Sequence, residues 1–147
     1  MSPEVWLASR KVIEDTARAN SVHVEWPNED NMRRPPPPAM WIAVEGAANT
    51  AGPLQIGYDA WNEHGQIFVH VMVPVGQGVL DGFTLRKVFS TAFRGINFTG
   101  QLPVGLIYMD DQSFDLLGPA SEDGVYVSMT LVVRYTYQDK LTNPPPY

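Results

Sequence analysis

The sequence predicts an α+β fold, a mostly antiparallel sheet with two helices packed on one face and the N-terminal helix first. Two stretches repeat apolar residues at helical spacing, whereas several others alternate apolar and polar residues as half-buried strands do. Two helices cannot cover both faces of so many strands, and turn signals between strands favour antiparallel pairing. The 147 residues match the roughly 150 expected of one domain, so residues 1–147 are interpreted as a single domain.

The first helix is expected to begin after Ser2, which can cap its N-terminus, with Pro3 at the first helical position. Its apolar stripe consists of residues at helical spacing: Val5, Trp6, Ala8, Val12, Ile13 and Thr16. The helix should end near Asn20. A short strand is expected over residues 22–26, because apolar and polar residues alternate there before Pro27.

Residues 28–38 are polar and rich in proline. Arg33 and Arg34 precede four consecutive prolines, which hold an extended polyproline II shape and cannot donate to a sheet. This segment is expected to be a flexible surface connection with a stiff end, and both a plain spacer and a docking segment are consistent with it. Three further prolines indicate a C-terminal tail over residues 140–147.

The next part of the chain predicts three strands. Residues 40–44 form an apolar run typical of a strand, and the small residues at 46–52 are expected to form a mobile loop. A β-hairpin should follow, because residues 54–58 and 67–73 each alternate apolar and polar side chains. Its turn is predicted at 62–65, where the sequence reads Asn-Glu-His-Gly.

The second helix carries an apolar stripe between Leu85 and Phe93 and should stop at Gly95. Gly76-Gln77-Gly78 precedes it, and glycines between a strand and a helix can cradle a phosphate. However, Gly82 stands one position late for that motif, and the preceding strands are predicted to pair as a hairpin. A tight turn is therefore favoured over a phosphate site.

The remaining sheet is expected to contain a strand over 102–109 and a long last strand over 125–137. Between them, residues 110–124 are acidic, are interrupted at Gly118-Pro119, and predict a connection with a short element at 114–117. Four apolar residues lie on the second faces of the strands, where burial against another subunit is expected: Phe68, Met72, Tyr126 and Val132.

Composition excludes several functions. The chain has no cysteine, which excludes disulfides, thiolate metal sites and thiol catalysis. Ten Lys and Arg against 16 Asp and Glu give a formal charge of −6, which disfavours nucleic-acid binding by charge. No apolar run approaches the roughly 18 residues of a membrane helix. The N-terminus lacks the basic region of a signal peptide, so a soluble, intracellularly made domain is expected.

The polar residues predict no catalytic, cofactor or metal site. His23 and His70 fall within expected strands and His64 within the expected turn, so none has the helical spacing of a zinc motif. Adjacent carboxylates at Asp110-Asp111 lie in an expected loop, where they should be solvated or face a partner.

The order of these features resembles the tail terminator (tail completion) proteins of long-tailed phages and of phage-derived gene transfer agents, over nearly the whole chain. The features that carry the resemblance follow the first helix in order: Trp26-Pro27-Asn28, a proline-rich stretch, the run 40–44, the strand 65–74, the turn 75–78, the helix stripe 85–93 and the terminal strand 125–137. The long proline run and the C-terminal tail depart from the family pattern and receive no role by analogy.

The resemblance implies a structural virion protein at the neck of the tail, made in the host cytoplasm. It implies a hexameric ring on the end of the tail tube, which stops tube polymerisation and presents a joining surface to the head-side connector. DNA would pass through the bore without specific binding, and neither a membrane nor a cofactor is involved. An acidic chain suits such a bore, because like charges prevent tight phosphate contacts.

Interface energy usually rests on aromatic and Arg side chains, which gives the candidate partner contacts: Arg33, Arg34, Tyr58, Trp61, Arg94 and Arg134. Trp61 lies near the expected hairpin tip, where burial in an interface and packing beneath a neighbouring loop are both open. Two rival functions remain. One is another neck component, a head-completion or stopper protein, and the other is a small nucleotide-binding enzyme that uses the turn at 76–82.

Overall fold

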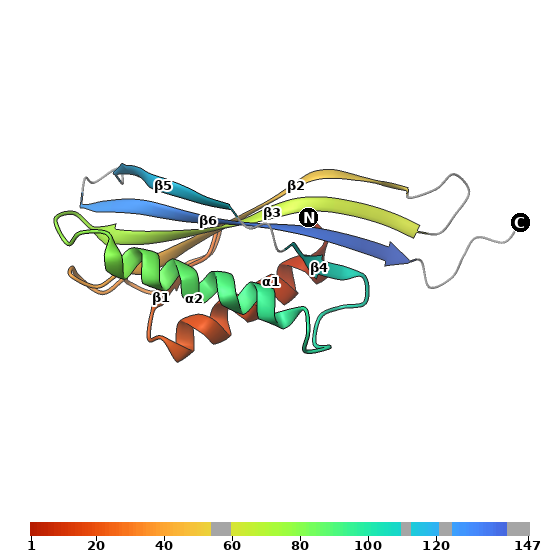
Figure 1. Ribbon diagram of the computed structural model, residues 1–147, viewed down its shortest axis with the longest axis horizontal. Helices are drawn as coiled ribbons and strands as arrows, with labels where there is room; N and C mark the ends of the chain where they lie inside the picture. The colour runs from red at the N-terminus through yellow and green to blue at the C-terminus, as the bar shows by residue number, and fades with distance from the viewer. Residues whose placement is uncertain (54–59, 110–112, 121–124, 141–147) are drawn as a thin grey trace, which may run out of the picture.

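Two 15-residue strands, β3 and β6, run side by side through the protein and carry the rest of the fold (Figure 1). This computed structural model describes residues 1–53, 60–109, 113–120 and 125–140, with the backbone alone at 48–53, 60, 113–120 and 140. The elements, in order, are α1 (Pro3–Ala19), β1 (His23–Glu25), β2 (Trp41–Pro53), β3 (Ala60–Pro74), α2 (Leu80–Ile96), β4 (Leu106–Tyr108), β5 (Ser113–Ala120) and β6 (Tyr126–Lys140).

The six strands form one mixed sheet in the order β1-β2-β3-β6-β4, and β5 also pairs with β6. Only the β1–β2 pair is parallel. The outer side of β6 is shared, because β5 pairs with its first half and β4 with residues 135–137. Both helices lie on the same side of the sheet (Figure 1). The predicted α+β class, with a mostly antiparallel sheet and its helices on one face, is confirmed.

The core lies between the helices and the sheet. Alternate residues of β3 and β6 face the helices, and the helices bury the stripes that the sequence predicts. Fully or almost fully buried side chains in this layer include Val5, Ile13, Ile67, Val69, Val71, Phe89, Phe93, Met129, Leu131 and Val133. Burial of each large aliphatic side chain contributes about 1.5–3 kcal/mol, so this layer provides the main stabilisation of the fold.

A buried carboxylate ties the start of α1 to the sheet. Glu63, only 3 % exposed, accepts hydrogen bonds from the Ser2 hydroxyl at 2.6 Å, the Ser2 backbone N–H at 3.1 Å and the Tyr135 hydroxyl at 2.5 Å. Ser2 therefore does not cap α1 with its side chain, contrary to expectation. Burial acts to raise the pKa of Glu63, but the hydrogen bonds from Ser2 and Tyr135 outweigh it and lower that pKa.

The turn predicted at 62–65 is wrong, because these residues lie inside β3 and pair with both β2 and β6. Gly65 is a packing glycine here, since a Cβ at this position would lie 2.5 Å from the Tyr135 hydroxyl and 2.5 Å from the Ala47 carbonyl oxygen. His64 is accordingly a strand residue and not a turn residue. The hairpin itself exists between β2 and β3, and its connection, with Tyr58, lies outside the described residues.

Other boundaries also differ from expectation. The loop predicted at 46–52 is part of β2, because it pairs along β3, with one register shift between Ala48 and Thr50. The short element predicted at 114–117, within the connection 110–124, is the eight-residue strand β5, whose register along β6 shifts on both sides of Leu117. A sheet edge of this kind tolerates the proline at position 119. The strand predicted over 102–109 shortens to β4, and α2 continues one residue beyond Gly95.

Two asparagine side chains occupy positions where a further strand would bond. The Asn97 amide donates to the Tyr108 carbonyl oxygen at 2.7 Å and accepts from the Tyr108 N–H at 3.0 Å. Asn31 makes the same reciprocal pair with Trp26, just beyond β1, at 2.9 and 2.8 Å. Each amide satisfies one outward-facing peptide unit, and therefore closes the edge of β4 and the end of β1 locally.

The second face of the sheet is partly covered by the chain itself, so three of the residues expected to need another subunit are already buried. Met72 and Tyr126 cluster with Trp41, and Val132 is only 7 % exposed. Phe68 is half-buried and stacks on the His70 ring at 6.2 Å.

Replacing Glu63 by Gln should lower the free energy of unfolding by about 1–3 kcal/mol at pH 7, because a buried charged acceptor is lost. The folded pKa lies below the ordinary value of 4.5, so the stabilisation is present above that value and is lost as the pH falls through the lowered pKa. Urea unfolding at pH 7, 5, 4 and 3 should show the gap between the native chain and E63Q closing below about pH 4.5. The exposed Glu4→Gln control should keep its small gap over this range; a constant E63Q gap contradicts the assignment.

Candidate interaction surfaces

The structure disperses the predicted contact residues over the molecule. Arg33 is exposed in the proline-rich segment, and Arg94 is exposed on α2. Trp61 is 45 % exposed at the start of β3, and Arg134 is half-buried on the second face of β6. Tyr58 lies outside the described residues. The five described residues therefore do not form one continuous site, although Arg33 and Arg34 line the same hollow.

Arg34 is used inside the chain. Its guanidinium donates to both Glu25 carboxylate oxygens, at 2.7 and 2.9 Å, and lies 3.7 Å from the centre of the Trp41 ring. It also faces the Tyr126 ring at 5.8 Å. Bidentate and cation–π contacts of this kind hold a side chain in place. Arg34 thus fastens the proline-rich segment onto β1 and the second face, and a hollow of about 500 Å³ lies beside it.

An exposed apolar patch lies at the end of the molecule where β3 leads into α2 (Figure 1). The Val75 N–H donates to the Val125 carbonyl oxygen at 2.8 Å, which joins this turn to the start of β6. The patch, named the α2-start patch, consists of Val75, Val79, Leu80, Phe83 and Val125, whose exposed fractions run from 36 % to 74 %. Such large side chains in solvent at one end indicate a contact surface.

A second set of exposed apolar residues lies toward the opposite end, where α2 finishes and β3 begins (Figure 1). It is named the β4-end set and consists of Trp61, Phe98, Val104, Ile107 and Met109. Val104 is 91 % exposed and Phe98 84 % exposed. A hollow of about 440 Å³ adjoins this set between residues 103–105 and the end of β6. The molecule therefore presents apolar side chains near both ends of its long axis.

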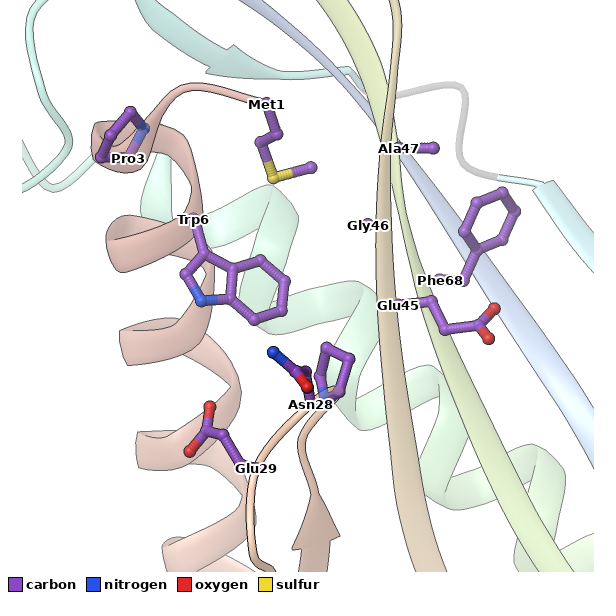
Figure 2. Close-up of a pocket in the computed structure, with 10 residues that line it drawn as sticks. Met1, Pro3, Trp6, Asn28, Glu29, Glu45, Gly46, Ala47 and Phe68 are labelled. Atoms are coloured by element: carbon purple, nitrogen blue, oxygen red, sulfur yellow. The ribbon is translucent and has the colours of Figure 1, made fainter.

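A hollow of about 680 Å³ lies between the start of α1 and β2. Met1 and Trp6 extend toward β2 at Gly46, while Glu45 and Phe68 lie on the other side of that strand (Figure 2). A Cβ at Gly46 would lie 2.8 Å from the Met1 methyl carbon, so glycine leaves room for these side chains. The hollow is apolar at its base and carries carboxylates at its rim.

Polar groups on the second face of the sheet form short bridges between strands. The His70 ring contacts the Thr130 hydroxyl at 2.8 Å and the Glu45 carboxylate at 3.0 Å, which links β2, β3 and β6. His64 contacts Asn62 at 2.8 Å and Thr136 at 3.4 Å. These residues are placed to hold neighbouring strands together.

Within the described ranges, no group of three or more His, Asp or Glu side chains is arranged to hold a metal ion. The same residues include no helix with the length and apolar character needed to cross a membrane.

Gly76 and Gly78 have φ of +88° and +77° and make the tight turn into α2, as expected. The acidic residues at 110–111 and 122–123 lie outside the described residues.

Apart from Trp61, the sequence does not predict the residues of the two end surfaces. Val75, Val79 and Leu80 are apolar residues around a glycine turn, and no periodicity distinguishes them from core residues. The open side chains at Phe98 and Val104 flank prolines and glycines, which is a weak indication of exposure. Only the fold shows that both groups lie at the ends of the long strands.

Comparison with known proteins points to one family. A family model described as "Phage tail terminator protein" matches residues 4–135. Among 21 matching chains of solved structures, one has a TM-score of 0.63 at 18 % sequence identity, over 96 % of this chain and 99 % of the other. That likeness concerns the fold. No curated protein matches the sequence.

Replacing Arg34 by Ala should reduce the free energy of unfolding by about 1–3 kcal/mol, since its charge-assisted bonds and its ring contacts are lost together. Urea unfolding monitored by tryptophan fluorescence measures the change. The neighbouring Arg33→Ala variant is the matched control, and its exposed side chain should change stability by less than about 0.5 kcal/mol. Equal effects of the two substitutions would contradict the fastening role of Arg34.

Proposed function

The chain belongs to the phage tail terminator family, and we propose that it caps the tail tube as a ring of six copies. In this proposal the ring stops tube polymerisation on one side and presents a joining surface to the head-side connector on the other. The protein acts by surface complementarity, without turnover or a cofactor. Family membership itself indicates a structural phage protein associated with the tail.

The observation that carries the proposal is the pair of apolar surfaces near opposite ends of the long strands. A subunit between a tube and a connector needs two axial contacts of different character. The α2-start patch and the β4-end set provide two such surfaces with different residues. Among the tryptophans of the described residues, Trp61 has the most exposed side chain, at 45 %, and aromatic side chains often dominate interface energy. We therefore assign the β4-end set to the tube and the α2-start patch to the connector.

The arrangement of layers also fits a bore. The helices cover one face of the sheet, so the part of the second face that the proline-rich segment leaves uncovered can line a channel. Glu45, Gln66 and Thr136 supply neutral and acidic groups there, beside Arg134. The net charge of −6 disfavours tight phosphate contacts, which suits passage of DNA without specific binding.

Trp61→Ala should leave the fold intact and weaken tube attachment at least tenfold, because truncating a central interface aromatic typically costs about 2 kcal/mol or more. Binding to purified tail tubes is measured by co-sedimentation, and tube length by negative-stain microscopy. The exposed Leu7→Ala variant on α1 is the control and should bind as the native chain does. Unchanged capping by W61A would contradict the assignment. Binding to filled heads but not to tubes would indicate another neck component.

Leu80→Asp should affect the other end. An added charge in the α2-start patch should leave tube capping unchanged and reduce joining of capped tails to heads, because a desolvated charge opposes an apolar contact. Counting joined and separate particles after mixing capped tails with filled heads measures this. The control Thr91→Asp adds the same charge at an exposed position of α2 about three turns from Leu80, away from the patch. Loss of tube capping by L80D, with joining intact, would reverse the assignment of the two ends.

A further inference from the structure

Most of β2 forms an open edge of the sheet. β1 pairs with β2 only from Trp41 to Ala43, and no strand of the described residues bonds to the same side of β2 over 44–53. Residues 45–47 are exposed. Alternate N–H and C=O groups of an edge strand point outward, so this edge can receive another strand.

The open edge of β2 contrasts with the two places where the chain closes its edges. Asn97 satisfies the outward peptide groups of Tyr108 on β4, and Asn31 does so for Trp26 after β1. The other long edge without a strand partner in the described chain is β5, which pairs with β6 on one side. The sheet therefore has two open edges of similar length on opposite sides, formed by β2 and β5. Beside them, asparagine side chains close the edge of β4 and the end of β1.

The hollow beside β2 supports strand addition at this edge. Its lining includes Gly46, the helix-side residues Met1 and Trp6, and Phe68 on the second face, so it extends around the strand edge (Figure 2). At about 680 Å³ it has room for a large side chain of an added strand. Strand addition gains affinity from main-chain hydrogen bonds and specificity from such pockets.

We propose that the open edge of β2 pairs with β5 of a second copy of this chain, and that this joint builds the ring. The proposal rests on the ring of the proposed function and names its lateral contact. β2 is antiparallel to β3, β3 to β6 and β6 to β5, so β5 and β2 run in opposite directions within one copy. In a ring, each copy is related to the next by rotation about an axis that runs roughly along the strands, so every strand keeps its direction along that axis. β5 of one copy and β2 of the next therefore meet as an antiparallel pair.

The positions of the two edges set the tilt of the strands in the ring. The middle of the open part of β2, at Ala48, is level with Tyr135 on β6, whereas Leu117 of β5 is level with Met129. Along the strands, this offset of six residues equals roughly 20 Å at about 3.4 Å per residue. Across the strands, one copy contributes β2, β3, β6 and β5, which span roughly 19 Å at about 4.8 Å each. For β5 of one copy to lie level with the open part of β2 in the next, the strands must tilt by about 45° from the ring axis. This is close to the tilt of roughly 35–45° found in closed sheets.

A second copy fits this edge better than an axial partner does. The two open edges differ from each other, so their contact is head-to-tail, which is the kind of contact that closes into a ring. Using both edges laterally also leaves the α2-start patch and the β4-end set for partners above and below. The sheet then continues from copy to copy, and the unprotected edges are removed.

Cysteine cross-linking tests the joint, because the chain has no cysteine of its own. Ala47→Cys protein is mixed with single-cysteine variants at each position of β5, alone at rising concentration and on purified tail tubes, and then oxidised. Disulfide dimers should form with one or two neighbouring β5 positions. Ala47→Cys mixed with Ile107→Cys is the control, since β4 is closed by Asn97, and should give less than a tenth of that yield.

Filling the hollow gives a second measurement. Gly46→Leu should weaken assembly at least tenfold, while Gly95→Leu, at a position with nothing within 4 Å of a Cβ, should not. Thermal unfolding of the isolated variants separates loss of folding from loss of assembly. Hydrogen exchange at residues 45–47 should slow in assembled native protein, which needs no variant.

The possible outcomes distinguish failure of the proposed β2–β5 contact from failure of the proposed tube-capping function. Capping of tubes without any β2–β5 dimer, or with faster dimers of Ala47→Cys alone, overturns the joint and leaves the proposed function standing. Rings with β2–β5 dimers that do not recognise tubes support the joint and overturn the proposed function. Unchanged exchange at 45–47 in assembled protein also overturns the joint.

Discussion

The fold depends on the register between β3 and β6. Their residues pair without a shift from Ala60 opposite Lys140 to Pro74 opposite Tyr126. Because side chains alternate between the faces of a strand, a slip of one residue would turn the whole buried set toward the second face. The single register places Val69 and Leu131 under the helices. It also places Tyr135 where its hydroxyl bonds to Glu63, which in turn accepts hydrogen bonds from Ser2 at the start of α1. Strands β2, β4 and β5 then attach to the sides of this pair.

Much of the architecture could be predicted from local patterns. The stripe of α1, the stripe of α2 and the alternation of β6 each report burial against one layer, so element type and the side of the sheet follow from them. The failures share one cause. Gly46, Gly65 and Pro119 predict loops or turns, whereas in the structure the two glycines allow close packing and the proline lies in an edge strand. Only tertiary contacts distinguish these roles.

The interaction surfaces are harder to predict from the sequence. Residue type indicates which side chains are common in interfaces, but it does not indicate where a given side chain lies on the folded surface. Its residue type makes Arg34 a candidate partner contact, because Arg is common in interfaces, yet its guanidinium binds Glu25 and lies over the Trp41 ring. Its position near the expected hairpin tip makes Trp61 a candidate contact, and its side chain does lie exposed near one end of the molecule. Open strand edges cannot be predicted from composition. A strand edge is open when no neighbouring strand bonds to its backbone N–H and C=O groups on one side, which depends on the fold.

The long β3–β6 pair also bears on how the subunit responds to force. A tension applied between the two ends of the molecule runs along these strands and loads their hydrogen bonds in shear, so that many bonds must fail together. Peeling from the side would break them one after another at a far smaller load. A particle component stretched or bent during infection would thus be mechanically stiff along its length and weakest at its flanks.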